Sequence, residues 1–166
     1  YRLALQTREQ HIRRDKATSN ICTAQALLAI VSAAYAVYHG PQGIKKIAES
    51  VSQLTKNFAD KLKQSGYELY SNDFFDTVTI KTLDKTEKIY KNALDQGVNI
   101  RKVNSEMLAV SFDERKNLYR ANQLLKIFNC SETIKESMNE SLSNIPKNLL
   151  RTSTYLDHPV FNRYHS

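Results

Sequence analysis

The sequence predicts an α/β fold in which long helices pack on one side of a small mixed or antiparallel sheet. Apolar residues recur at three- and four-residue spacing over 44–62, which predicts an amphipathic helix. From Tyr67 onward the period changes from 3.6 to 2, which is typical of strands. Two further apolar runs, 98–103 and 107–112, are joined by a tight Asn104–Ser105 turn, so these two strands cannot be parallel. The resulting order is two helices followed by β-β-α-β-β-α.

The N-terminal part begins with a predicted strand over 1–6 and continues as a polar loop over 7–23. At the end of this loop, Ser19 or Asn20 can cap a helix that extends to His39. The helical segment is strongly apolar from residue 24, but it is shorter than the roughly 20 residues that span a bilayer. We therefore expect a buried helix and not a membrane anchor.

Glycine and proline mark the ends of the predicted helices. Gly40–Pro41 stops the first helix, and Gly66 closes the second. A third helix ends at Gly97, and the pair Asp84 and Glu87 resembles a capping box at its start.

The sequence gives further signals for the strands and for the C-terminal part. Phe74, Val78 and Ile80 are expected on one face of the second strand, and Asp113 is expected to cap a helix that runs to Phe128. Residues 131–142 are compatible with one more amphipathic helix. Residues 144–166, which are polar and contain Pro146 and Pro159, are predicted to form an extended tail or linker.

Composition indicates a folded and basic protein. Hydrophobic residues make up 41% of the 166 residues and charged residues 25%, and the net charge is +7. A surplus of cations fits an anionic partner such as nucleic acid, phosphate or an acidic protein, although a solvated basic surface explains it as well. The two distant cysteines, Cys22 and Cys130, suggest reduced thiols in an intracellular protein. Because the first residue is Tyr1 and not Met, we expect a piece of a longer polypeptide.

The residue types and their spacing exclude most kinds of catalytic or metal site. The four histidines have no His, Cys or Asp at a spacing that builds a metal site or a triad, and no glycine-rich phosphate loop can be written. His39 is explained most simply as a residue at a helix C-terminus. The loop that carries His11, Arg13, Thr18, Ser19 and Asn20 offers hydroxyls and backbone N–H groups at a helix start, which suits a phosphate. Helix capping alone would also explain Thr18, Ser19 and Asn20.

Several segments in this order resemble glycine dehydrogenase (decarboxylating), the P-protein family of the glycine cleavage system. The segments, which span nearly the whole chain, are 7–23, 35–40, 74–77, 99–101, 110–114 and 158–166. The resemblance implies a fold type I pyridoxal-phosphate enzyme, an oxidoreductase that decarboxylates glycine and transfers the aminomethyl group to the lipoyl arm of H-protein. It also implies a bacterial cytoplasmic location, or a mitochondrial one in a eukaryote, and no nucleic-acid or membrane partner.

The resemblance places this chain at the end of the N-terminal half of such an enzyme. Residues 1–22 would close the large domain and form the polar interface loop, 23–142 would form the small domain with its leading helices, and 143–166 would link to the second half. In related proteins the cofactor lysine belongs to the catalytic half, which would then be the partner of this chain.

Two departures from the family pattern indicate a non-catalytic role. No lysine lies in a cofactor motif, and Ala109 stands where related subunits tend to carry an arginine for the substrate carboxylate. We therefore expect no catalytic residue and no metal ligand in this chain. The resemblance suggests that Thr18, Ser19 and Asn20, together with His11 and Arg13, contact the cofactor of the catalytic half across the interface. The alternative is a basic module that binds nucleic acid.

Overall fold

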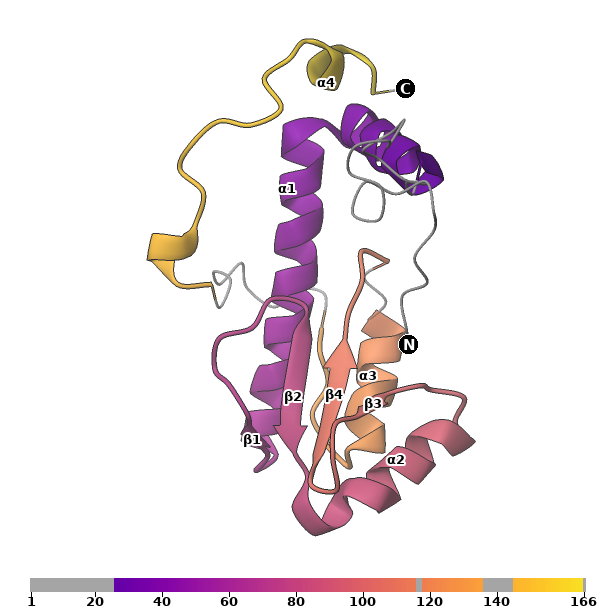
Figure 1. Cartoon of the computed structure of the whole chain (residues 1–166). Helices are drawn as coiled ribbons and strands as arrows, with labels where there is room; N and C mark the ends of the chain where they lie inside the picture. The colour runs from indigo at the N-terminus through magenta and orange to yellow at the C-terminus, as the bar shows by residue number, and fades with distance from the viewer. Residues whose placement is uncertain (1–25, 116–117, 136–144, 166) are drawn as a thin grey trace, which may run out of the picture. The chain divides into compact units, whose positions relative to one another are not determined.

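The computed structural model describes residues 26–115, 118–135 and 145–165 (Figure 1). The elements are α1 (Ala26–Gln64), β1 (Glu68–Leu69), β2 (Thr77–Lys81), the 3-10 turn η1 (Leu83–Lys85), α2 (Thr86–Asp95), β3 (Arg101–Lys102), β4 (Met107–Ser111), α3 (Leu118–Ile127), the 3-10 turn η2 (Lys147–Leu149) and α4 (Val160–Arg163). The chain divides into a smaller unit, Tyr1–Pro41 with Leu156–Ser166, and a larger unit, Gln42–Tyr155.

The four strands form one antiparallel sheet in the order β1-β2-β4-β3. Val78 pairs with Val110 and Ile80 with Leu108, so these four buried side chains lie on the same face of the sheet. The prediction of a small sheet is confirmed, and of the mixed and antiparallel alternatives the antiparallel one is correct.

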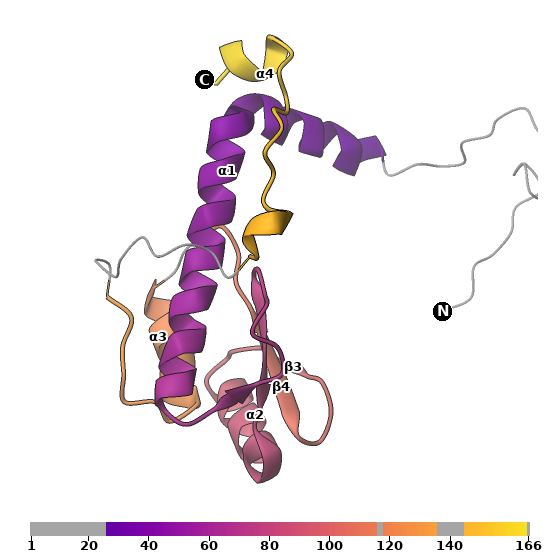
Figure 2. The same ribbon diagram turned by 90° about the vertical axis from the view of Figure 1, so that its left-hand side faces the viewer.

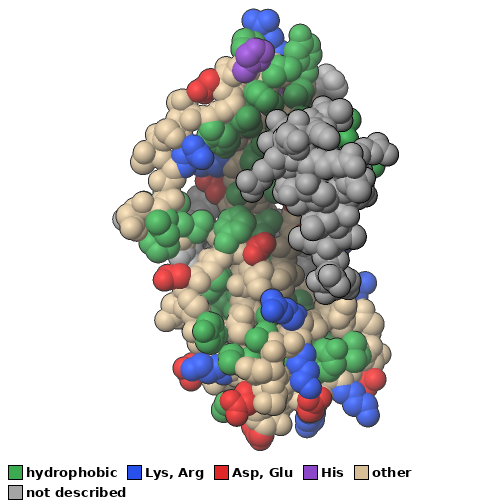
Figure 3. Space-filling model, in the orientation of Figure 1, with side chains coloured by type: hydrophobic (Ala, Val, Ile, Leu, Met, Phe, Trp, Pro, Cys, Tyr) green, Lys and Arg blue, Asp and Glu red, His purple; other side chains and the backbone are tan. Residues whose placement is uncertain are grey.

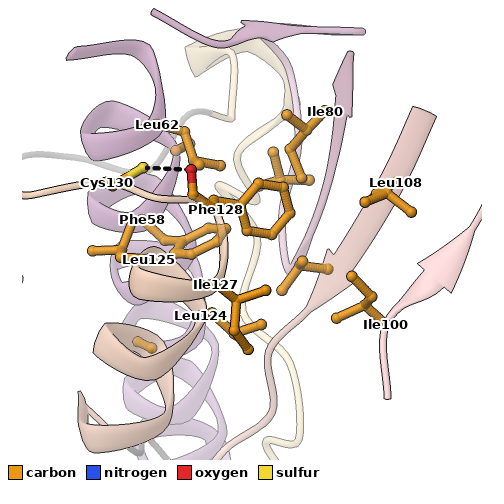
Figure 4. Close-up of a cluster of buried hydrophobic side chains, with 14 of the residues drawn as sticks. Phe58, Leu62, Ile80, Ile100, Leu108, Leu124, Leu125, Ile127, Phe128 and Cys130 are labelled. Atoms are coloured by element: carbon orange, nitrogen blue, oxygen red, sulfur yellow. Dashed lines mark hydrogen bonds between the residues drawn. The ribbon is translucent and has the colours of Figure 1, made fainter. Parts of the chain in front are cut away.

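The helices of the larger unit share a single core with that sheet face. Phe58 and Leu62 from α1, Ile89 from α2 and Leu125 from α3 are all nearly inaccessible to solvent and belong to one apolar cluster. Figure 2 shows α1 and α3 on the same side of the sheet, and Figure 4 shows how their side chains meet β2 and β4. The predicted layering, with helices on one side of the sheet, is therefore confirmed.

The predicted helix ends are also confirmed. Gly40 has φ 62° and ψ 179°, which breaks the helical path inside α1 so that two helices adjoin there, with Pro41 at the first position of the second. Gly66 ends α1: its N–H donates to the carbonyl of Lys63, and the N–H of Tyr67 donates to that of Leu62, both at 3.0 Å. This pair of bonds requires a left-handed residue, and the φ of Gly66 is 88°.

The capping box predicted at the start of α2 is wrong. Asp84 lies inside η1, and α2 begins only at Thr86, whose hydroxyl donates to the carbonyl of Leu83 at 2.7 Å. Glu87 does not reach back to the chain before the helix, because its carboxylate pairs with Lys102 on β3. The residue types of a capping box are present, but Glu87 forms an ion pair with Lys102 on a distant segment and does not cap the helix.

The helix predicted over 131–142 is not present in its described part, residues 131–135, and residues 136–142 lie outside the described residues. The side chain of Asn122 on α3 holds Ile134 in an extended backbone, accepting from its N–H at 2.7 Å and donating to its carbonyl at 3.1 Å. Ile134 is buried in the core by this contact. The side-chain amide thus takes the place of helical backbone bonds.

Smaller differences concern the strands and the tail. β1 and β3 are shorter than predicted, and Phe74 precedes β2. The β3–β4 loop has four residues, 103–106, in which the N–H of Glu106 donates to the side chain of Asn104. Asp113 accepts from the N–H of Arg115 in a turn that comes before α3. The described part of the predicted extended tail, residues 145–165, contains η2 and α4 and otherwise forms neither helix nor strand.

Candidate functional site

The residues that the sequence suggests for cofactor contact, His11, Arg13, Thr18, Ser19 and Asn20, lie outside the described residues. Their role therefore stays a prediction. The strand predicted over 1–6 lies outside as well. Two other places in the described chain gather the segments that carry the family resemblance, one in each unit.

In the smaller unit, the C-terminal segment closes on the break in α1. The Nδ1 atom of His165 lies 2.9 Å from the carbonyl oxygen of Tyr38, so Nδ1 carries the hydrogen and donates it. That carbonyl belongs to the last turn before Gly40, where helix carbonyls have no helical donor. His165 is thus a cap for the first helix of α1. Sequence reasoning missed this because 127 residues separate the partners.

Gly40 is required by the same contact. A Cβ atom placed there would lie 2.8 Å from the carbonyl oxygen of Phe161 and 2.8 Å from Cε1 of His165. Its φ of 62° is also a conformation that residues with a side chain rarely adopt. We call this contact between Tyr38–Gly40 and Phe161–His165 the tail latch.

The segment before His165 is folded by its own side chains. The amide of Asn162 donates to the carbonyls of Leu156 and His158 at 3.0 and 3.2 Å, and the N–H of Val160 donates to Nδ1 of His158 at 3.2 Å. His158 and Asn162 therefore shape this segment, and neither forms a metal site. Within the part of the chain that the structure describes, no group of three His, Cys, Asp or Glu side chains could hold a metal ion.

In the larger unit, a pocket of about 860 Å³ opens where the β3–β4 hairpin separates. The ladder between these strands ends at the pair Arg101 and Ala109, so the chain before Arg101 is no longer paired with β4. Residues of α3 line the gap that this leaves. We call this pocket the hairpin groove. Its lining residues are Leu54, Gly97, Val98, Asn99, Ile100, Arg101, Ala109, Val110, Ser111, Phe112, Asp113, Arg115, Arg120 and Leu124.

The hairpin groove contains the position at which the sequence lacks the expected arginine. Ala109 on β4 is 3% exposed and lies directly opposite Thr79 on one side and Arg101 on the other. Cross-strand partners share a face of the sheet, so a guanidinium lies next to this position although β4 does not supply it. The sequence alone could not reveal the pairing, because it depends on the register of a two-residue strand.

The buried thiol of Cys130 is not a candidate nucleophile. Burial raises the pKa of this thiol, and burial together with the nearby thiol raises the pKa of Tyr67. A thiol that resists ionisation is a weak nucleophile, and Cys130 lies among core side chains (Figure 4). Its role is that of a small apolar core residue.

The first helix of α1 forms as predicted, but its predicted burial is wrong for this chain. Leu27, Leu28, Ile30 and Val31 are 72, 62, 66 and 53% exposed. In the space-filling view, the surface around the sheet carries both Lys or Arg and Asp or Glu side chains (Figure 3). No helix among the described residues has both the length and the apolar character of a membrane span.

Comparison with known proteins identifies the family. A family model described as "Glycine cleavage system P-protein" matches residues 1–128. The chain is 98% identical over 166 residues to a glycine dehydrogenase (decarboxylating) of Pelagibacter ubique, covering all of the chain and 17% of that protein. It is 50% identical over 171 residues to the enzyme of that name from Photobacterium profundum, covering 99% of the chain and 18% of that protein.

A solved structure extends the likeness to the fold. A crystal structure of glycine decarboxylase (P-protein) of the glycine cleavage system, in inhibitor-bound form, is similar with a TM-score of 0.56 and 27% identity, over 75% of this chain and 30% of that one. The chain thus spans less than a fifth of the length of the curated relatives it matches. The order of its motifs, its α/β architecture and these matches agree, and the chain belongs to the glycine cleavage system P-protein family.

Proposed function

We propose that this chain is a non-catalytic, interface-forming part of a pyridoxal-phosphate-dependent glycine decarboxylase. The whole enzyme would decarboxylate glycine and pass the aminomethyl group to the lipoyl arm of H-protein. The observation that carries the proposal is the match over the full length of the chain to about a sixth of a glycine dehydrogenase. The remaining length of such an enzyme would hold the cofactor lysine and the catalytic half.

The first helix of α1 supports an interface role. A helix that is apolar all round is stable when it is covered, and the large side chains from Leu27 to Val31 are more than half exposed in this chain. In the proposed enzyme, the remainder of the polypeptide covers them. The tail latch would hold the C-terminal segment at the other end of this helix, where the chain continues toward the second half.

The hairpin groove does not fit a covalently held pyridoxal phosphate. Its lining residues include three arginines and no lysine, so it offers no amine for a Schiff base. In the proposal, therefore, this chain contributes to the cofactor pocket only from outside, through Thr18 and, beside it, Ser19, Asn20, His11 and Arg13. The basic loop that carries them would also be available to an acidic surface of H-protein.

The contribution of Thr18 is tested in the full-length enzyme. We expect Thr18→Ala to weaken pyridoxal-phosphate affinity about ten-fold, because a hydrogen bond to a charged phosphate is lost. The measurements are cofactor titration and the exchange of the glycine carboxyl carbon with carbon dioxide. Thr18→Ser keeps the hydroxyl and should stay close to the unchanged enzyme. If Thr18→Ala leaves both cofactor affinity and exchange unchanged, Thr18 has no such role.

The absence of a catalytic lysine gives a second expected result. When the 166-residue chain is mixed with pyridoxal phosphate and treated with borohydride, we expect no single lysine to retain an adduct, because no lysine lies in a cofactor motif. Peptide mass spectrometry measures the occupancy of each lysine, with the full-length enzyme as the positive control. One lysine modified far above all others in the isolated chain would contradict the non-catalytic assignment.

A further inference from the structure

The hairpin groove combines apolar walls with an excess of positive charge. Leu54, Ile100, Phe112 and Leu124 provide apolar surface from α1, the segment before β3, the end of β4 and α3. Figure 4 shows Ile100 and Leu124 at the edge of the core cluster. Among the lining residues there are three arginines and one aspartate, which gives a local charge of 3 − 1 = +2.

Arg101 is the cation best placed to receive a ligand. Asp113 accepts from Nε of Arg115 at 3.2 Å, and Arg120 donates to the side chain of Gln123 at 2.8 Å. The side chain of Arg101, in contrast, makes no hydrogen bond or ion pair with any residue that the structure describes, and it lies on the same sheet face as buried Ala109. A guanidinium presents its N–H groups in a planar fork that matches a carboxylate or a phosphate.

The backbone of β4 adds a donor on the same side. In an antiparallel ladder, alternate residues turn their N–H and C=O groups to opposite neighbours. Phe112 donates to the carbonyl of Asp76 on the β2 side at 2.9 Å, so the backbone groups of Ser111 are directed to the β3 side. The β3–β4 ladder has ended before that point, which leaves these groups facing the hairpin groove.

From these observations we propose that the hairpin groove binds a small organic anion, namely a carboxylate or phosphate carried on a short apolar body. The oxyanion lies in the gap where the β3–β4 ladder has ended and accepts from the N–H of Ser111. The guanidinium of Arg101 reaches it from the outer face of the sheet, and the apolar body packs on Ile100, Phe112 and Leu124 on the core face. The volume of about 860 Å³ is in the range of small-molecule sites. This proposal concerns the larger unit alone and does not depend on the glycine decarboxylase assignment.

Calorimetric titration of the 166-residue chain with three matched probes tests the class of ligand. Hexanoate and hexyl phosphate carry the anion on the same alkyl body, and hexanamide is the neutral control. We expect saturable binding of at least one anion, weakening as salt is added, and no detectable binding of hexanamide. A preference between hexanoate and hexyl phosphate identifies the anion. Equal binding of hexanamide, or no binding of either anion, overturns the proposal.

Substitutions of one arginine inside the hairpin groove and one outside it test whether the anion binds at Arg101. Arg101→Ala should weaken anion binding about ten-fold or more, because a charged bidentate contact is lost. Arg101→Lys should retain part of the affinity, since it keeps the charge but not the planar fork. Arg151 is an exposed arginine of the same unit outside the hairpin groove, and Arg151→Ala should bind as the unchanged chain does. Equal losses in Arg101→Ala and Arg151→Ala would show a general charge effect and overturn the proposal.

Discussion

Replacing Phe58 by alanine is expected to lower the free energy of unfolding of the larger unit by about 3–5 kcal/mol. The ring of Phe58 is 0% exposed and lies 5.2 Å from that of Phe112 and 6.2 Å from that of Phe128, measured between ring centroids in edge-on geometry. Its removal leaves a cavity where α1, β4 and α3 meet. Because small proteins have only about 5–15 kcal/mol of stability, this loss is a large fraction of the total.

Urea unfolding followed by circular dichroism measures the effect on Phe58→Ala. Phe75→Ala is the matched control, since the same atoms are removed from a side chain that is 40% exposed. We expect the control to lose at most about 1 kcal/mol, because less apolar surface returns to water. Phe58→Leu, which refills part of the space, should fall between the two. Equal losses for Phe58→Ala and Phe75→Ala would contradict the position of Phe58 at the centre of the core.

The second large effect is expected at Gly40. Gly40→Ala introduces a Cβ that meets the carbonyl oxygen of Phe161 and the ring of His165, each at 2.8 Å. One of these obstacles is backbone and cannot turn away as a side chain can. The substitution also carries the penalty of a left-handed residue, roughly 1–2 kcal/mol. We therefore expect the tail latch to open and the bond between His165 and Tyr38 to be lost.

Hydrogen exchange of the backbone amides resolves this effect by segment. In Gly40→Ala, exchange should accelerate over 160–163 and remain unchanged over the strands 77–81 and 107–111 of the larger unit. Gly66→Ala is the matched control, because its φ is 88° but no atom lies within 4 Å of the added Cβ. It measures the backbone penalty alone. If exchange over 160–163 is the same in Gly40→Ala as in the unchanged chain, the tail latch does not depend on Gly40.

Signals that act over a few residues predicted most of the fold. The apolar period over 44–62 gave the second helix of α1, and Gly66 and Gly97 gave the helix ends because a left-handed residue there completes a local bond pattern. The hairpin between β3 and β4 was predicted for the same reason, since a short connection forces antiparallel pairing. The family resemblance, carried by ordered motifs, is confirmed by the family match and by relatives that align with the whole chain.

Predictions failed where a distant partner competed with a local pattern. Glu87 pairs with Lys102 in place of capping α2, and Asn122 holds Ile134 extended in place of a helical turn. Burial of the first helix of α1 was inferred from apolar composition, yet no described residue of this chain covers Leu27 to Val31 enough to bury them. An apolar composition indicates that a helix is buried in the folded protein, but it does not indicate which part of the polypeptide packs against it.

By itself, the sequence determined the family and the order and type of most of the described elements, because periodicity, glycine positions and motifs are local properties of a chain. Only the tertiary structure decided that His165 caps the helix that ends at Tyr38, and that Arg101 lies beside Ala109 in the hairpin groove. Both contacts depend on strand register or on a left-handed glycine that admits a segment more than a hundred residues away. Such contacts arise from packing, and packing is decided by the whole chain at once.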